Sequence, residues 1–262
     1  MHPFVNTATM IARQAGALIV RAMDRRDKLK VQTKGLHDYC TQVDLQSEAL
    51  IVSLIQQHYP DHGIIAEEGN QQDSTHKEDI TWIVDPLDGT TNFIHGIPHL
   101  CVSIGILQNG HLEHGIVYDP FRDELFTATR GQGARLNQHR LRMEPVTLNT
   151  ALLGTGFPYR ELKPIQQYLA ILEDLMQNSA GIRRFGAAAL DLCYVAANRF
   201  DGFFEFNLKP WDIAAGALII SEAGGKVTDL EGELNFMDNG HILAAHPQLH
   251  AALLEKIQAH RP

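Results

Sequence analysis

The chain has 262 residues, of which 44% are hydrophobic and 20% are charged, a composition typical of a globular protein with a sizeable core. The formal net charge of −9 argues against a generic nucleic-acid binder, because such proteins usually carry a basic surface. Three cysteines without ligand or redox spacing, no signal-peptide pattern and no apolar run near the roughly 18 residues of a membrane span predict a cytoplasmic protein.

The first half of the chain predicts two amphipathic helices followed by several strands. Apolar residues spaced by three and four favour helices over 4–25 and from about Thr41 or Asp44 to His58. Alternation and turn residues predict an antiparallel or mixed sheet, with strands over 63–66, 80–84, 100–107, 111–118 and 124–129 and a short one after Gly133. Two polar segments are left, 28–39 as a mobile loop or hairpin and 70–79 as a surface loop.

From about Thr150 the pattern changes to alternating strands and helices. We expect strands over 151–154, 203–206 and 242–245, and helices over 164–177, 187–197, 211–223 and 247–258. The third of these helices is apolar almost all round, which predicts that it is buried. The residues alone therefore predict a mixed α and β protein with a seam near residue 150.

The segment from Trp82 to Phe93 carries the strongest chemical signal. An apolar strand is expected to end at Asp85, and a turn fixed by Pro86 would bring Asp88 back beside it, with the carbonyl of Leu87 between them. Carboxylate and carbonyl oxygens are hard ligands that suit Mg²⁺ or Mn²⁺ better than Zn²⁺.

The residues that follow this acidic pair predict an anion site. A short helix is expected to begin there, so the backbone amides of Gly89, Thr90 and Thr91 would face a phosphate group. A cation site beside an anion site is what a metal-dependent phosphatase needs.

Three separated motifs resemble the inositol monophosphatase family, and most closely its bacterial inositol-1-monophosphatases. They are Ile65–Gly69, Asp85–Phe93, and Trp211–Gly216 with Glu222–Gly225 after it. The resemblance covers essentially the whole chain. It implies a layered α-β-α-β-α sandwich, a single phosphatase domain (1–262) with lobes 1–149 and 150–262, and an active site between the lobes.

The resemblance also implies metal ligands and a nucleophile. Glu67, Asp85 and the Leu87 carbonyl would hold a first Mg²⁺, and Asp85, Asp88 and Asp212 a second, with a third, weaker ion near Glu67 and Mn²⁺ as a possible substitute. Two such ions hold the attacking and leaving oxygens of a displacement at phosphorus. Thr90 and Asp44 match the pair that orients a water on the first metal and relays its proton.

Further positions match substrate contacts of the family. Ala188 and Glu205 would contact the inositol ring, and Asp88 and Asp212 can also accept from its hydroxyls. The implied reaction is hydrolysis of myo-inositol 1-phosphate. Because the motifs are shared, a sugar-bisphosphate or phosphoadenosine-phosphate phosphatase is the alternative.

The family also implies a homodimer, inhibition by lithium and, in some bacterial members, binding to RNA polymerase, for which Arg183 and Arg184 are the candidates here. A regulatory protein that binds the transcription machinery is therefore a third reading.

Local explanations compete for several of these residues. Asp212 could cap its helix and Asp44 could be the N-cap of the second helix. Glu205 could be a charged residue at a strand end, and Lys34, implied near the third metal, a solvated loop lysine. Arg183 and Arg184 could serve only surface solvation or dimer contact.

Overall fold

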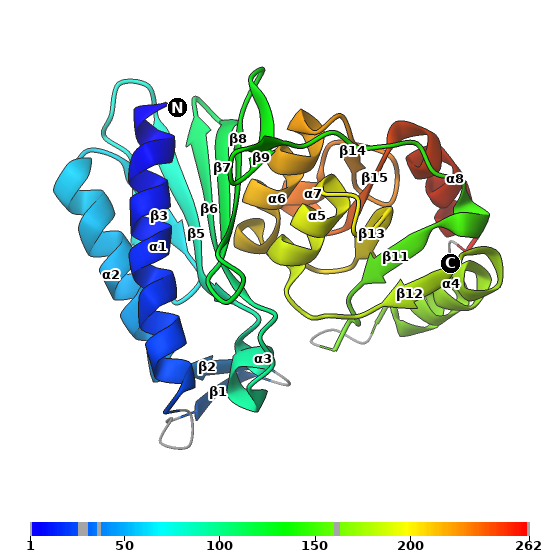
Figure 1. Ribbon diagram of the computed structural model, residues 1–262, viewed down its shortest axis with the longest axis horizontal. Helices are drawn as coiled ribbons and strands as arrows, with labels where there is room; N and C mark the ends of the chain where they lie inside the picture. The colour runs from blue at the N-terminus through cyan, green and yellow to red at the C-terminus, as the bar shows by residue number, and fades with distance from the viewer. Residues whose placement is uncertain (1, 26–30, 36–37, 160–162, 261–262) are drawn as a thin grey trace.

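The computed structural model describes residues 2–25, 31–35, 38–159 and 163–260. Its helices and sheets form an α-β-α-β-α sandwich (Figure 1), which confirms the predicted fold class. The layers are, in order, helices α1 (Pro3–Met23) and α2 (Gln42–His58), a first sheet, helices α5 (Ala188–Ala196) and α6 (Pro210–Glu222), a second sheet, and helices α4 (Ile165–Asn178) and α8 (Pro247–Gln258).

The first sheet comes from the first half of the chain. Its strands are β3 (Gly63–Ala66), β4 (Gln71–Gln72), β5 (Ile80–Asp88), β6 (Cys101–Gln108), β7 (His111–Asp119), β8 (Glu124–Thr129), β9 (Gly133–Leu136) and β10 (His139–Arg140). They lie in the order β10-β9-β8-β7-β6-β5-β3-β4. Strands β3 and β5 pair in parallel, and the other neighbouring pairs are antiparallel, so the sheet is mixed as expected.

The second sheet comes from the second half of the chain. Its strands are β11 (Leu152–Thr155), β12 (Gly181–Arg183), β13 (Gly202–Glu205), β14 (Lys226–Thr228) and β15 (Ile242–Ala245). They lie in the order β12-β11-β13-β15-β14, and β11 is parallel to both of its neighbours. The smaller elements are the hairpin β1 (Val31–Gly35) and β2 (Asp38–Thr41), α3 (Thr90–His95), α7 (Phe236–Asn239) and the 3-10 turn η2 (Leu148–Thr150).

Several short elements were not predicted from the sequence. Strand β4 lies inside the expected surface loop 70–79, and β10 in a polar stretch; β12, β14, α7 and η2 were also missed. Each has two to four residues. That is too short to show a periodic apolar pattern, and the strands exist because a neighbouring strand supplies their hydrogen bonds. Among the described helices, none combines the length and apolar character that a bilayer crossing requires.

Helix α6 fills the centre of the sandwich and approaches the first sheet closely. Its residues from Ile213 to Ile220 are all buried, which confirms the expected buried helix. Gly105 on β6 permits the approach, because a Cβ atom there would lie 2.8 Å from the Cβ of Ala214. The first turn of α6, with Asp212, is thereby held against the end of β5.

Candidate active site

Strand β5 contains a one-residue bulge between Asp85 and Asp88. Asp85 pairs with Ser103 and Asp88 with Cys101 on β6, so three steps along β5 match two along β6. In a regular strand, residues three apart point to opposite faces, and the extra residue restores a common face. The expectation that the strand ends at Asp85 was wrong, because pairing with β6 resumes after the bulge and continues to Asp88.

Hydrogen bonds fix the chain inside this bulge. The Leu87 amide donates to Oδ1 of Asp85 at 3.0 Å, and the Ser47 hydroxyl donates to the Pro86 carbonyl at 2.9 Å. The Thr90 hydroxyl lies 3.2 Å from the Leu87 carbonyl oxygen. Proline fits this position because it has no amide hydrogen to place in the ladder.

Helix α6 brings Asp212 to the same place. One oxygen of Asp212 accepts from the Lys209 amide at 2.7 Å, so the capping interaction considered from the sequence is present. The Ser103 hydroxyl donates to the Trp211 carbonyl at 3.3 Å and ties this first turn to β6. One carboxylate oxygen from each of Asp85, Asp88 and Asp212 lies within 4.8 Å of the other two, so the acids form a triad that could hold a metal ion.

The triad is electrostatically strained without a cation. Burial raises the pKa of Asp85 well above its usual range, and the charges of Glu67, Asp88 and Asp212 raise it further. Burial and the charge of Asp212 raise the pKa of Asp88 to about 7, although the Ala189 amide donates to it at 2.8 Å. Buried like charges are stable when a cation neutralises them, and an all-oxygen donor set fits a hard divalent ion.

A pocket of about 620 Å³ opens beside the triad and contains most of the residues singled out from the sequence. Its lining includes Glu67, Asp85, Leu87, Asp88, Gly89, Thr90, Thr91, Ala188, Glu205 and Asp212. These residues come from both sheets and from the first turns of α3, α5 and α6. The pocket therefore lies where the two halves of the chain meet.

Asp44 lies next to this pocket and contacts it through Thr90. Its Oδ1 accepts from the Thr90 hydroxyl at 2.7 Å, and its Oδ2 accepts from the Thr41 amide at 2.9 Å. The suggestion that Asp44 is the N-cap of α2 was wrong, because Thr41 is the N-cap and Asp44 is the third helical residue of a capping box. Burial raises the pKa of Asp44.

Burial also changes the pKa of Glu205, the last residue of β13. Burial raises the pKa of this carboxyl well above its usual range, while the positive charge of Arg184 lowers it. Arg184 lines the pocket and lies over the rings of Phe157 and Tyr159, at 5.8 and 5.6 Å from their centroids. Arg183 and Arg184 are both exposed, but only Arg184 lines the pocket.

Sequence reasoning missed several residues around the pocket. Tyr39, Phe157 and Tyr159 line it but carry no motif. The carboxylate of Glu48 is fully buried and accepts from the amides of Glu68 and Asn70, which holds the turn after Glu67. A charged residue on the inner face of α2 was a usable signal for that role. The side chain of Lys34 lies outside the part of the chain that the structure describes.

The model of the inositol monophosphatase family matches residues 1–261, and the chain belongs to this family. Among its relatives is the protein named Nus factor SuhB of Pseudomonas aeruginosa, 49% identical over 266 residues that span 100% of this chain and 98% of the relative.

Two solved structures show the same fold. The extragenic suppressor protein suhB of Bartonella henselae has a TM-score of 0.95 and 40% identity, and the match covers 98% of this chain and 99% of that one. The inositol monophosphatase II of Staphylococcus aureus, solved with inositol monophosphate bound, has a TM-score of 0.83 and 29% identity, with 99% and 95% covered.

Proposed function

We propose that this protein is a Mg²⁺-dependent phosphatase that hydrolyses myo-inositol 1-phosphate to myo-inositol and phosphate. The observation that carries the proposal is the convergence of the carboxylates of Asp85, Asp88 and Asp212 within 4.8 Å, at the wall of a pocket of about 620 Å³. Family membership and the bound ligand of the staphylococcal structure support the substrate class.

The proposed metal ligands are those that the family resemblance implies, and the triad of Asp85, Asp88 and Asp212 supports them. Glu67, Asp85 and the Leu87 carbonyl would hold one Mg²⁺, and Asp85, Asp88 and Asp212 a second, with a third ion near Glu67 and Mn²⁺ as a substitute. Bound ions of this kind make a water more acidic and neutralise charge on the phosphoryl and leaving oxygens.

Proton transfer is assigned to Thr90 and Asp44. In the proposed reaction, the hydroxyl of Thr90 accepts a proton from the attacking water while its own proton passes to Asp44, 2.7 Å away. Burial raises the pKa of Asp44, which makes its carboxylate a stronger base than one at the surface. The P–O bond to the polyol breaks as the bond to the water oxygen forms; the leaving oxygen takes a proton from solvent, and Asp44 later returns its proton to solvent.

Substrate binding is assigned to the helix starts and to Glu205. The amides of Gly89, Thr90 and Thr91 would donate to phosphate oxygens. The first turns of α5, which begins at Ala188, and of α6, which contains Asp212, add two positive helix ends. Glu205, Asp88 and Asp212 would accept from ring hydroxyls.

Phosphate release from myo-inositol 1-phosphate with Mg²⁺ tests the proposal, together with the variants Asp85→Asn and Asp212→Asn. We expect each variant to lose at least about 100-fold in kcat, because a ligand of the reacting ions is removed. Asp229→Asn is the matched control, since Asp229 is a buried, hydrogen-bonded aspartate outside the pocket. Full turnover in either pocket variant would remove the two-metal assignment.

The choice of substrate needs its own measurement. A sugar bisphosphate and a phosphoadenosine phosphate should be compared with myo-inositol 1-phosphate by kcat/KM. The proposal requires the inositol ester to rank first, and lithium to inhibit by occupying the second metal position. Light scattering of the eluted protein tests the proposed homodimer.

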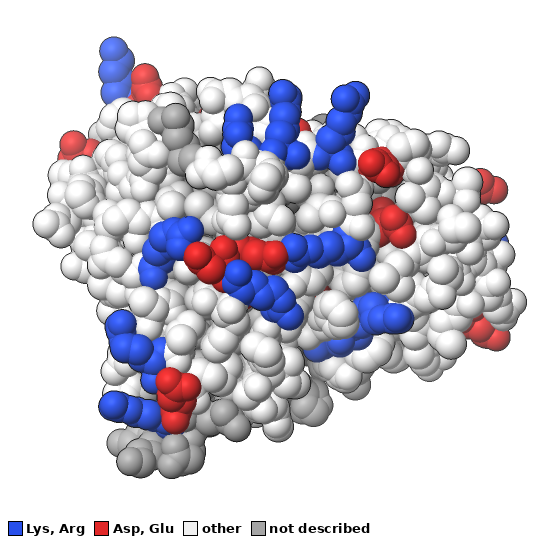
Figure 2. Space-filling view, viewed as in Figure 1, with Lys and Arg blue, Asp and Glu red and all other residues white. Residues whose placement is uncertain are grey.

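A second proposed function is binding to the transcription machinery, favoured by the name Nus factor SuhB of a relative that is 49% identical. On the face shown in Figure 2, Lys and Arg side chains lie among Asp and Glu side chains, which favours a protein partner over nucleic acid. Recovery of RNA polymerase should be compared between the wild type, Arg183→Ala and Arg184→Ala. Equal recovery in all three, or none, would remove Arg183 and Arg184 from this role.

A further inference from the structure

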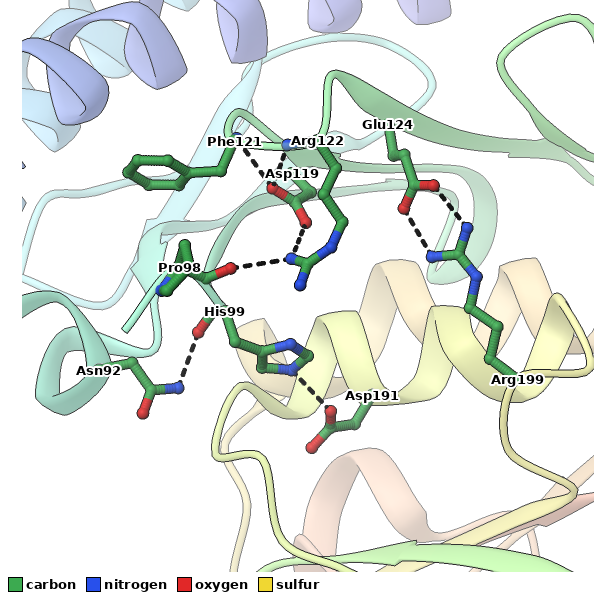
Figure 3. A network of polar contacts seen from close by, with 9 residues as sticks. All are labelled: Asn92, Pro98, His99, Asp119, Phe121, Arg122, Glu124, Asp191 and Arg199. Carbon is green, nitrogen blue, oxygen red and sulfur yellow. Dashed lines mark hydrogen bonds and ion pairs between the residues drawn. The ribbon is translucent and has the colours of Figure 1, made fainter. Parts of the chain in front are cut away.

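A buried hydrogen bond joins His99 to Asp191 (Figure 3). Neither residue lines the pocket, although Ala188, three residues before Asp191, does. Nε2 of His99 lies 2.8 Å from Oδ1 of Asp191, and the two residues are 6% and 2% exposed. With Asp191 ionised, Nε2 of His99 is the donor, because an ionised carboxylate can only accept. The rings of Phe185 and Tyr194 pack on the imidazole and exclude water from the pair.

This pair ties the beginning of α5 to the segment that links α3 with β6. Asp191 lies in the first turn of α5, and the Gly186 amide also donates to its carboxylate. His99 belongs to the linking segment, where the Asn92 amide group donates to its carbonyl at 2.7 Å and to the Phe185 carbonyl at 2.9 Å. Side-chain hydrogen bonds thus connect the segment between α3 and β6, from the first half of the chain, to the start of α5, from the second half.

The start of α5 contacts the carboxylate of Asp88 directly, and both segments pack against the next residue, Gly89. The Ala189 amide in the first turn of α5 donates to Oδ2 of Asp88 at 2.8 Å. Gly89, which follows Asp88, has a positive φ of 96° and packs against the same two segments. A Cβ atom on Gly89 would lie 3.0 Å from the His99 carbonyl oxygen and 3.3 Å from the Cβ of Ala187.

The linking segment is also supported from its other side. The guanidinium of Arg122 donates to the carbonyl of Pro98 at 2.8 Å and to Asp119 at 2.9 Å (Figure 3). Hydrogen bonds therefore hold the backbone at Pro98 and His99 in place. The imidazole of His99 is buried, so it cannot move away from Asp191 into solvent without a shift of this backbone. The bond between His99 and Asp191 connects this fixed backbone to the first turn of α5.

We infer that His99 and Asp191 are positioning residues that orient Asp88 for cation binding, through the start of α5 and its Ala189 amide. This inference rests on the proposed role of Asp88 as a Mg²⁺ ligand. Partners that orient a metal ligand typically contribute 10- to 100-fold to metal affinity. His99 and Asp191 act one step further away, so we expect the lower end of that range.

The experiment compares His99→Phe with His250→Phe as a matched control. His250 is also a buried histidine that bonds through Nε2, to the Thr228 hydroxyl at 2.9 Å, but it lies outside the pocket. Three quantities are measured on the metal-free protein and in turnover: the Mg²⁺ dissociation constant by calorimetry, Tm, and the Mg²⁺ concentration for half-maximal activity. We expect about a 10-fold rise in both Mg²⁺ constants for His99→Phe, and a lower Tm without that rise for His250→Phe.

A double variant, His99→Phe with Asp191→Leu, keeps the test decisive if His99→Phe leaves Asp191 buried without its partner and fails to fold. Replacing both partners by apolar groups avoids the lone buried charge. The double variant should be near wild type in Tm and still bind Mg²⁺ about 10-fold more weakly. Asp191→Asn, which can still accept from His99, should recover most of the affinity.

The outcomes separate this inference from the proposed function. A wild-type protein that binds Mg²⁺ and hydrolyses the ester, with Mg²⁺ constants unchanged in both folded variants, overturns only the positioning role. A wild-type protein that neither binds Mg²⁺ nor hydrolyses any phosphate monoester overturns the proposed function and this role together.

Discussion

The hydroxyl of Thr90 donates to a carboxylate oxygen of Asp44 across 2.7 Å, which joins the first turn of α3 to the first turn of α2. The other oxygen of Asp44 accepts from Thr41. One carboxylate therefore caps a helix and contacts the pocket at the same time.

The proposed relay predicts a specific effect of removing the Thr90 hydroxyl. Thr90→Val should lower kcat by about 10²–10⁴-fold, because a positioned proton acceptor contributes an amount of that order. Its Mg²⁺ dissociation constant should change little, and Thr90→Ser should keep most of the activity. Steady-state kinetics with calorimetry checks this, and a Thr90→Val enzyme with normal kcat would exclude the relay.

The triad predicts opposite effects of Asp85→Asn with and without metal. In the metal-free protein the variant should be more stable by roughly 2–6 °C in Tm, because a buried charge that repels its neighbours is removed while the acceptor for the Leu87 amide is kept. With Mg²⁺, the wild type should gain stability and the variant should not. Thermal unfolding in chelator and in excess Mg²⁺ measures both, and a destabilised metal-free variant would contradict the electrostatic argument.

Asp88 predicts the pH dependence of the metal-free protein. Its pKa is about 7 in the folded chain against an ordinary value of 3.8, so between about pH 4 and 7 the folded state binds more protons than the unfolded state. The free energy of unfolding should therefore fall as pH rises through that range, by on the order of 2–4 kcal/mol from this group. Urea unfolding of the metal-free protein at pH 5 and pH 7.5 checks the sign, with Asp88→Asn as the comparison.

The same carboxyl predicts that Mg²⁺ competes with a proton. The apparent Mg²⁺ dissociation constant should be about 10-fold higher at pH 6 than at pH 8, because below a pKa of about 7 the ligand must lose its proton first. Calorimetry in two buffers of different ionisation enthalpy should also detect the released proton. A constant that does not change over this range would show that Asp88 is ionised before the metal binds.

Glu205 predicts a change in substrate preference. Glu205→Gln should raise KM for myo-inositol 1-phosphate several-fold, because the proposed acceptor for ring hydroxyls is weakened. A monoester without such hydroxyls, p-nitrophenyl phosphate, is the control and should keep its KM. Equal changes for both substrates would point to a general effect on the pocket.

Much of the fold was predictable because its long elements carry clear apolar periods. Strand β8 and helix α8, with six and twelve residues, begin and end where the sequence indicated. The acidic motif also indicated its own partners, since Asp85 and Asp88 are close in sequence. Asp212 could be joined to them only through the family resemblance, because its approach depends on how α6 packs against the first sheet.

Other parts of the site leave no local trace in the sequence. The bulge at Pro86 is defined by the register with β6, so the strand seemed to end at Asp85. His99 and Asp191 lie in segments far apart along the chain, and the only usable signal was a carboxylate, Asp191, on a helix that is otherwise apolar. Such a group is costly to bury, and its partner becomes known only when the two halves are packed together.

The division of the triad between the two halves sets an order for folding. All strands of the first sheet, with the bulge at Pro86, come from the first half of the chain, which carries Asp85 and Asp88 but not Asp212. Until α6 has been synthesised and docked, the triad lacks Asp212, so the proposed binding of a cation would be a late event of folding. If Mg²⁺ binds as proposed, it would connect the two halves of the finished sandwich, and its dissociation should precede separation of the two sheets when the protein unfolds.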